Sequence, residues 1–332
     1  MLLAALTALL VATPDAPLFI FQDERIAESS SLVAASSGDL LYTANDSGDT
    51  ARVFTVDRSG RTTAVHDLPG VEPEDVEDAG LGPGPTLYLA DTGDNRAQRR
   101  SVAVLAVPEP TAGAAPQPRT TTLTYEDGAH DAEALLVHPR TGQLLVVTKN
   151  LLGSGVYAAP QPLADGVLRR VASVRPEVTG TAGGPQPQTA AQLLVTGGAV
   201  SPDGRRLVVR TYTDAYVYDV PGEDLVDAFT GAPQVLPLPA TAQGEAVTWT
   251  RDGKALLTSS EGVGAPVHRV PVPARKAAGR TSSARATSPA ASPRSRQAPT
   301  SEEDGAPLLP LAVLGGLLLG AALLLRRRRT HG

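Results

Sequence analysis

A pattern of short apolar strands separated by Gly-containing turns recurs along most of the chain. Each copy has a small or acidic start, an apolar strand, a turn, a second apolar strand, a loop and a third strand. The copies occupy residues 28–57, 76–108, 132–160, 196–220 and 244–272. Four of the turns read SSGD, PRTG, SPDG and TRDG, and they hold the Gly or Asp that tight hairpins need. This repetition predicts an array of similar β-units.

Further strands complete the repeats. Fourth strands are predicted at 61–68, 120–127, 167–174 and 232–239. The fifth copy has none, whereas a spare strand stands ahead of the first copy at 17–26. We therefore predict an all-β fold, a β-propeller of five four-stranded blades that is closed by the N-terminal strand, because closure leaves no exposed sheet edge. The stretch 175–195, rich in Gly, Pro and Gln, is either a long insertion or a degenerate blade, so six blades are the alternative.

The two ends of the chain carry targeting signals. Residues 2–12 form an apolar run of the length of a signal-peptide core, which predicts a signal peptide at 1–16, with a buried first strand as the alternative. Residues 306–325 contain no charge, and four arginines follow at once. They predict one C-terminal transmembrane helix with a basic cytoplasmic tail at 326–332.

The segment between the propeller and the predicted helix has a different composition. Residues 274–305 are rich in Ser, Pro, Ala and Arg and poor in large apolar residues, which predicts a disordered stalk. The resulting prediction is a single-pass protein of the cell membrane whose propeller domain, 17–273, is extracellular.

Composition excludes several classes of function. The chain has no cysteine and only five histidines, which excludes thiol chemistry and argues against a zinc or copper site. A net charge of −6 argues against nucleic acid as a partner. No HExxH, G-x-S-x-G or Walker motif occurs, so no catalytic residue is predicted.

Two similar loops, ANDSGDT and ADTGDN, contain Asp-Ser-Gly and Asp-Thr-Gly, which are the signature of aspartic proteases. They stand one repeat apart, and neither Asp-x-Gly is followed by the usual Ser or Thr. We interpret both as the connection between the second and third strands of neighbouring blades.

Charged residues recur at equivalent positions of the repeats. In a propeller, the starts of the innermost strands and the ends of the second strands lie on one face. The predicted rim or ligand-binding residues are Asp46, Glu77, Asp78, Asp131, Lys149, Arg210, Glu245 and Glu261. The predicted calcium ligands are Asp91, Asp94, Asn95 and Glu133, because Ca²⁺ takes six to eight oxygen ligands. The alternatives are local Asx-turns, contacts between acids and backbone amides of the next blade, and simple ion pairs.

The turns SPDG and TRDG resemble those of bacterial WD40-like or YVTN-like propellers. Together with ADTGDN, HDAEALLV and GEAV, they resemble the secreted phytase-like (esterase-like) propellers of bacteria over about residues 24–273. A chain so rich in Ala, Gly and Pro, with lysine only at 149, 254 and 276, is typical of a high-GC bacterium such as an actinobacterium. The expected function is a surface module that binds an extracellular ligand or protein. The resemblance implies the alternative, a Ca²⁺-dependent phosphoesterase or esterase.

Overall fold

The computed structural model describes residues 16–37, 39–110 and 117–274. The chain divides into two compact units, Met1–Arg275 and Lys276–Gly332, and the described residues all belong to the first. The predicted signal peptide lies almost wholly outside the described residues, as do nearly all of the predicted stalk and the whole of the predicted transmembrane helix and tail. Within the described ranges, no helix is both long and apolar enough to cross a membrane.

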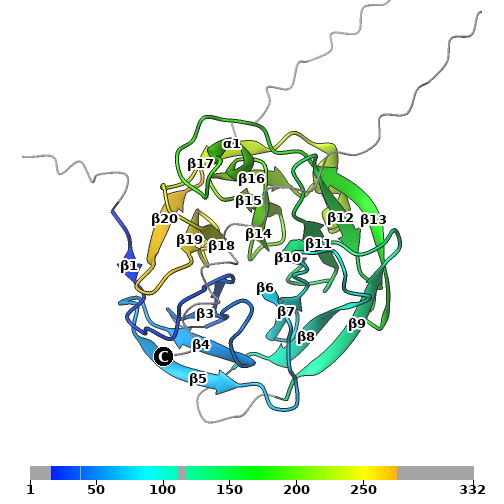
Figure 1. Cartoon of the computed structure of the whole chain (residues 1–332), viewed down its shortest axis with the longest axis horizontal. Coiled ribbons are helices and arrows are strands. Elements are labelled where there is room, and N and C mark those ends of the chain that lie inside the picture. Colours follow the sequence, from blue (N-terminus) through cyan, green and yellow to red (C-terminus); the bar gives the residue numbers. More distant parts are fainter. Residues whose placement is uncertain (1–15, 38, 111–116, 275–332) are drawn as a thin grey trace, which may run out of the picture. The chain divides into compact units, whose positions relative to one another are not determined.

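The strands of the described residues form antiparallel groups of four, which we call blades 1 to 5 (Figure 1). Blade 1 contains β2 (Val33–Ala34), β3 (Leu41–Thr43), β4 (Arg52–Val56) and β5 (Thr62–Asp67). Blade 2 contains β6 (Val76–Gly82), β7 (Thr86–Asp91), β8 (Val102–Pro108) and β9 (Arg119–Tyr125). Blade 3 contains β10 (Ala132–Val137), β11 (Leu144–Thr148), β12 (Ser154–Ala158) and β13 (Gly166–Val174).

The last two blades follow the same order. Blade 4 contains β14 (Val195–Val200), β15 (Arg206–Thr211), β16 (Asp214–Asp219) and β17 (Gln234–Pro237). Blade 5 contains β18 (Gly244–Trp249), β19 (Ala255–Ser260), β20 (Pro266–Pro271) and β1 (Phe19–Ile20). Each observed strand overlaps the segment that the repeat pattern predicts.

The blades surround a common centre, which is the architecture of a β-propeller (Figure 1). Each innermost strand contacts those of both neighbours, in the cyclic order β2, β6, β10, β14, β18 and back to β2. At the outside, β13 pairs in parallel with β9, so that blades 2 and 3 share one eight-stranded sheet.

The N-terminal strand completes the last blade, as predicted. β1 pairs antiparallel with β20 through Phe19 opposite Val267 and Ile20 opposite Pro266. Phe19 and Phe21 are buried in an apolar cluster between blades 5 and 1. The paired strand is shorter than the predicted 17–26, because the chain turns away after Phe21 and the amide of Gln22 donates to a carbonyl of blade 1.

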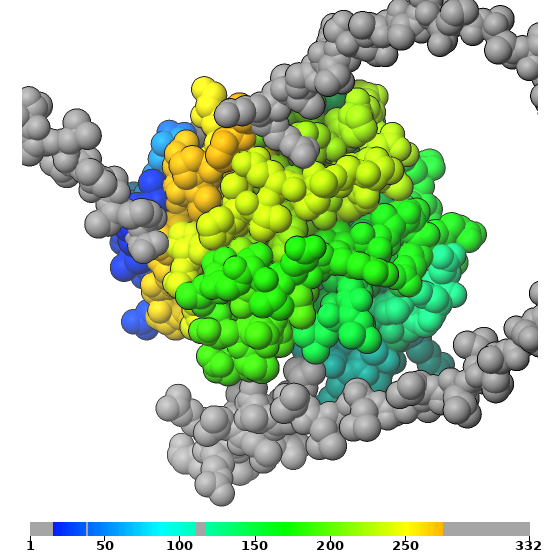
Figure 2. Space-filling model, turned by 90° about the horizontal axis from the view of Figure 1, so that it is seen from above, coloured from blue at the N-terminus to red at the C-terminus, as the bar shows by residue number. Residues whose placement is uncertain are grey.

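The stretch 175–194 contains no strand. It is a connection with one short helix, α1 (Gln188–Ala191), and the side-chain oxygen of Gln192 accepts hydrogen bonds from the amides of Thr179 and Gly180. The amide of Gly184 donates to the carbonyl of Thr241 at 2.8 Å, and the green and yellow parts of the chain lie side by side in Figure 2. A 3₁₀ helix, η1 (Leu225–Thr230), follows blade 4's third strand.

The apolar core lies between neighbouring blades. Strands β10, β11, β18 and β19 are buried at every position, so both of their faces contact other sheets. Such strands read as continuous apolar runs, and the side-chain period of two is lost from the sequence. This packing holds the innermost strands rigidly around the axis, where the candidate site lies.

Candidate functional site

Three glutamates meet near the axis. Glu77, Glu133 and Glu245 come from β6, β10 and β18, and one carboxylate oxygen of each lies within 4.8 Å of those of the other two. Their exposed fractions are 5%, 2% and 5%. Three blades thus bring acids that are far apart in the sequence into one buried group, which we call the glutamate cluster.

β-bulges aim these side chains inward. The pairing register of β6 with β7 passes from Val76 to Asp78 and leaves Glu77 as the extra residue. The register of β10 with β11 likewise skips Glu133, and a shift in β18 includes Glu245. A bulge leaves one residue unpaired and re-aims its side chain, which explains why acids at the strand starts converge.

The other two blades carry hydroxyl groups at the equivalent position. Thr196 stands at the bulge of β14, and its Oγ1 donates to the carbonyl of Gly244 at 3.0 Å. Ser30 in blade 1 donates to the carbonyl of Val76 at 2.8 Å. These two hydroxyls bind the neighbouring blade, and only the three glutamates face one another.

Lys149 is the counter-ion of the cluster. Its Nζ donates to Oε1 of Glu133 at 2.7 Å, and the ammonium lies 5.2 Å from the ring centroid of Tyr212. The side chain is 15% exposed. Burial opposes the charged form, but the attraction of Glu133 and the other acids outweighs it and raises the pKa of Lys149 well above its usual value. One positive charge therefore faces three carboxyl groups.

The acids of the cluster hold protons more tightly than exposed acids do. Burial raises the pKa of Glu133 to about 7, although Lys149 acts in the opposite direction. Burial and the charge of Glu133 raise the pKa values of Glu77 and Glu245 well above normal. Asp75, half-buried nearby, has its pKa raised to about 6, first by burial and then by Asp131. A cation would replace these protons.

Glu77 lies against the loop that follows β7. Glu133 binds Lys149, and Glu245 interacts with Glu261. A Cβ at Gly93 would come within 2.5 Å of Oε1 of Glu77 and of the carboxyl group of Asp75, so a larger residue at 93 would displace these two carboxyl groups.

A second acidic group lies beside the cluster. Burial, followed by a hydrogen bond and repulsion from Glu28, raises the pKa of Asp46 to about 9, and Glu261 adds to the effect. Gln243 donates its side-chain amide to Glu261. Asp46 of blade 1 and Glu261 of blade 5 thus lie beside the glutamate cluster.

Hydrogen bonds within the protein occupy two of the predicted calcium ligands, Asp91 and Asp94. Asp91 Oδ1 accepts from the guanidinium of Arg99 at 2.9 Å and from the amide of Asp75 at 2.9 Å. Asp94 accepts from the amide of Arg99 at 2.7 Å, and Asn95 is exposed. These residues order the loop 93–99, which lines a depression of about 470 Å³. Of the predicted set, only Glu133 belongs to the three-carboxylate group found in the described residues.

Two predicted rim residues, Asp78 and Asp131, accept hydrogen bonds from backbone amides of neighbouring blades. Asp78 is fully buried and accepts from the amides of Leu135 at 2.8 Å and Gly198 at 3.0 Å, in blades 3 and 4. Burial raises its pKa well above normal, and these amides oppose the rise. Asp131 accepts from the amide of Asp94 at 2.8 Å and so anchors the loop 93–99.

Arg210 is the cationic counterpart of Asp78. Its guanidinium donates to backbone carbonyls, including those of Ala246 at 2.8 Å and Ser259 at 3.2 Å in blade 5. Burial lowers its pKa to about 10, so the group stays charged at neutral pH. The interblade alternative considered for the acids therefore describes Asp78, and Arg210 has the same role.

Three residues of the site were missed by the sequence analysis. Tyr212 follows the end of β15 as Lys149 follows β11, but a search for charged residues passes over it. Asp75 precedes its strand by one residue, outside the repeat as aligned. Gly93 lies in the loop ADTGDN, which the sequence analysis assigns only as a connection between strands.

A comparison with solved structures finds several proteins that are distantly similar to this chain. A gluconolactonase from Xanthomonas campestris is 14% identical, with 77% of this chain and 89% of that chain covered and a TM-score of 0.44. The structure of a nidogen/laminin complex matches at 15% identity, with 71% and 73% covered and a TM-score of 0.42. A luciferin-regenerating enzyme matches at 10% identity, with 73% and 76% covered and a TM-score of 0.42. No family model matches the sequence, and no curated protein does.

Proposed function

We propose that this chain is a five-bladed β-propeller module that binds a ligand through a divalent cation held by Glu77, Glu133 and Glu245. The observation that carries the proposal is the convergence of three buried glutamates, whose carboxylate oxygens lie within 4.8 Å of one another. When all three carboxyl groups are ionised, they carry more negative charge than Lys149 can neutralise, and a cation would compensate the excess.

The chemistry of the cluster fits a hard cation such as Ca²⁺. Carboxylate oxygens are its preferred ligands, and three glutamates supply fewer than its usual six to eight unless all bind through both oxygens. The remaining positions would be filled by water or by oxygen atoms of a bound ligand. This arrangement supports a recognition role in which the cation bridges the propeller and an oxygen-rich partner.

A thermal-shift titration with Ca²⁺, Mg²⁺ and Mn²⁺ tests the proposal on the full chain. A cation that binds only the folded state raises the melting temperature as its concentration rises. Glu77→Gln keeps the side-chain volume and should abolish the shift, whereas Glu223→Gln, at an exposed site in blade 4, should preserve it. No shift with any of the three metals, or an equal shift in both variants, would overturn the proposal.

A hydrolytic role is the second candidate, and Lys149 is the observation that favours it. A buried ammonium next to a cation site could bind a phosphoryl or carboxyl oxygen that the metal also polarises. Hydrolysis of p-nitrophenyl phosphate or acetate that requires Ca²⁺ and disappears in Glu77→Gln would support an enzyme. A Ca²⁺ shift without hydrolysis supports a binding module.

We further propose that the module is displayed outside the cell by a C-terminal membrane anchor. The support is the uncharged run 306–325 followed by four arginines. Protease added to intact cells should cut within 274–305 and release the propeller. Protection of that stretch until lysis would reverse the proposed orientation.

A further inference from the structure

A depression adjoins the glutamate cluster. It has a volume of about 470 Å³, within the range of small-molecule sites. Its lining comes from the residues that directly precede β6 and from the loop after β7: Glu74, Asp75, Gly93, Asp94, Asn95, Arg96, Gln98 and Arg99. Gly93 lies against Oε1 of Glu77 and the carboxyl group of Asp75, so the depression continues directly from the cluster. A ligand bound to a cation in the cluster therefore reaches this depression.

The lining that the structure describes is polar. Asn95, Arg96 and Gln98 are exposed and offer N–H donors, and the two amides also offer acceptors. Asp75 and Glu74 offer carboxylate oxygens. Neither an aliphatic nor an aromatic residue is among those that line it. The depression thus suits a ligand whose surface both donates and accepts hydrogen bonds.

Charges of both signs lie in this lining. The guanidinium of Arg99 pairs with Asp91 at 2.9 Å and with Glu74 at 3.4 Å. Arg96 adds a positive charge, whereas Asp75 lies on the side of the glutamate cluster. A ligand with a net charge of either sign would meet like charges here. A neutral hydroxyl group, which donates one hydrogen bond and accepts two, can bind both kinds of side chain.

The loop 93–99 is held in one conformation before any ligand binds. The amide of Asp94 donates to the carboxylate of Asp131 at 2.8 Å, and the amide of Ala97 donates to the carbonyl of Asp94 at 2.7 Å. Ala97 has a φ of 49°, and it is the one residue other than Gly with positive φ among those described. A loop whose conformation is already fixed loses little freedom on binding, which favours affinity.

We propose that the ligand of the cation site is a saccharide. The inference rests on the proposed function, because two neighbouring hydroxyl oxygens of the sugar fill positions that the three glutamates leave open on the cation. The remaining hydroxyls bind Asn95, Arg96 and Gln98 in the depression. Since the lining offers no aromatic face for stacking, the sugar is recognised through its hydroxyl groups.

Calorimetric titration of the full chain with methyl glycosides tests this inference. The probes are the methyl α-pyranosides of glucose, mannose and galactose, which differ in the orientation of their neighbouring hydroxyls. In saturating Ca²⁺, at least one of them should bind at a single saturable site, and the same titration in EDTA should show no binding. The fully O-methylated form of that sugar, which has no hydroxyl to donate, is the matched control and should not bind.

Two neighbouring arginines provide matched variants. Arg96→Ala should weaken sugar binding about tenfold, because the guanidinium loses its hydrogen bonds to the ligand. Arg100→Ala should not weaken it, since Arg100 is exposed nearby but does not line the depression. The Ca²⁺ thermal shift of each variant shows whether its cation site is occupied.

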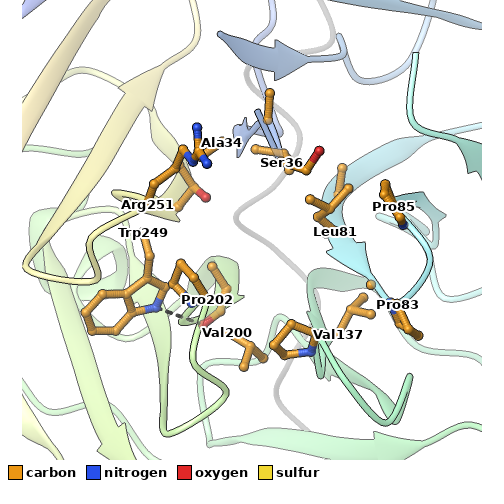
Figure 3. A pocket seen from close by; sticks show the side chains of 18 of the residues that line it. Ala34, Ser36, Leu81, Pro83, Pro85, Val137, Val200, Pro202, Trp249 and Arg251 are labelled. Carbon is orange, nitrogen blue, oxygen red and sulfur yellow. Dashed lines mark hydrogen bonds between the residues drawn. The ribbon is translucent and has the colours of Figure 1, made fainter. Parts of the chain in front are cut away.

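Trp249 reports whether each variant is folded. It is the only tryptophan of the chain, it is 1% exposed, and its indole N–H donates to the carbonyl of Ala199 at 3.3 Å (Figure 3). Four positions of β18 separate it from Glu245, a rise of about 13 Å at 3.3 Å per residue. Its emission should therefore match that of the unmodified chain in both arginine variants.

Three results would overturn the saccharide proposal. The first is a Ca²⁺ shift without saturable binding of any of the three glycosides. The second is equal sugar affinity in Ca²⁺ and in EDTA. The third is an equal loss of affinity in Arg96→Ala and Arg100→Ala. Each of these leaves the cation site standing, whereas the absence of a Ca²⁺ shift in the unmodified chain overturns the proposed function itself.

Discussion

Raising the pH from 5 to 8 without divalent cations should destabilise the propeller through Glu133. Its pKa is about 7 in the folded chain, against an ordinary value of 4.5. The raised pKa means that the folded state keeps a proton that the unfolded state has lost. The stabilising effect is complete below pH 4.5 and disappears as the pH rises through 7. Linkage gives a loss of about 2 to 3 kcal/mol between pH 5 and pH 8.

Urea denaturation in EDTA at pH 5, 6, 7 and 8, followed by the emission of Trp249, measures this loss. The corresponding fall in melting temperature is about 5 to 10 °C for a domain of this size. Glu133→Gln should lower stability at every pH, because Lys149 loses its partner, but the loss between pH 5 and pH 8 should become smaller by about 2 to 3 kcal/mol. Saturating Ca²⁺ should reduce the fall in the unmodified chain, because the cation binds the ionised acids.

The decisive comparison is between the pH dependence of the free energy of unfolding in the unmodified chain and that in Glu133→Gln. Parallel curves for the unmodified chain and Glu133→Gln would show that Glu133 is already ionised at pH 5, and the reasoning from burial would be refuted. Glu223→Gln serves as the control for removing an exposed acid, and its curve should match that of the unmodified chain.

Three further predictions concern glycine positions and an interblade contact. Gly60→Ala should destabilise the chain by more than about 2 kcal/mol in urea denaturation, because its Cβ would collide with the carbonyl of Ile20 in β1. Gly48→Ala is the control, because Gly48 also has a positive φ but open space around it, and it should cost only about 1 kcal/mol. Equal losses of stability in Gly60→Ala and Gly48→Ala would contradict the packing of β1 against Gly60. Gly93→Ala should weaken Ca²⁺ binding at least tenfold in the thermal-shift titration. An unchanged titration would show that the loop 93–99 does not contribute to the cation site. Arg210→Met should cost about 3 kcal/mol or more, because buried carbonyls of two blades lose their donor, and a smaller loss would argue against an interblade role.

The order of the strands was determined by the sequence. The alternation of apolar runs with Gly and Asp turns located the blades, and the absence of a fourth strand after the fifth repeat predicted the pairing of β1 with β20. These features are local: a turn needs Gly where φ is positive, as at Gly204 and Gly253, and a strand needs apolar residues to bury. The 175–194 connection could not be assigned in the same way, because its folding depends on contacts with Gln192 and Thr241.

The assembly of the acidic site was decided by the tertiary structure. Glu77 and Asp78 are adjacent in the sequence, yet the bulge directs one to the cluster and leaves the other to bind amides of two blades. Asp91 has the residue type of a metal ligand, but Arg99 lies within hydrogen-bond distance of it. A repeat shows which positions share a rim. Which side chains face the axis depends on bulges and on the neighbours available at each position, and these exist only when the ring is closed.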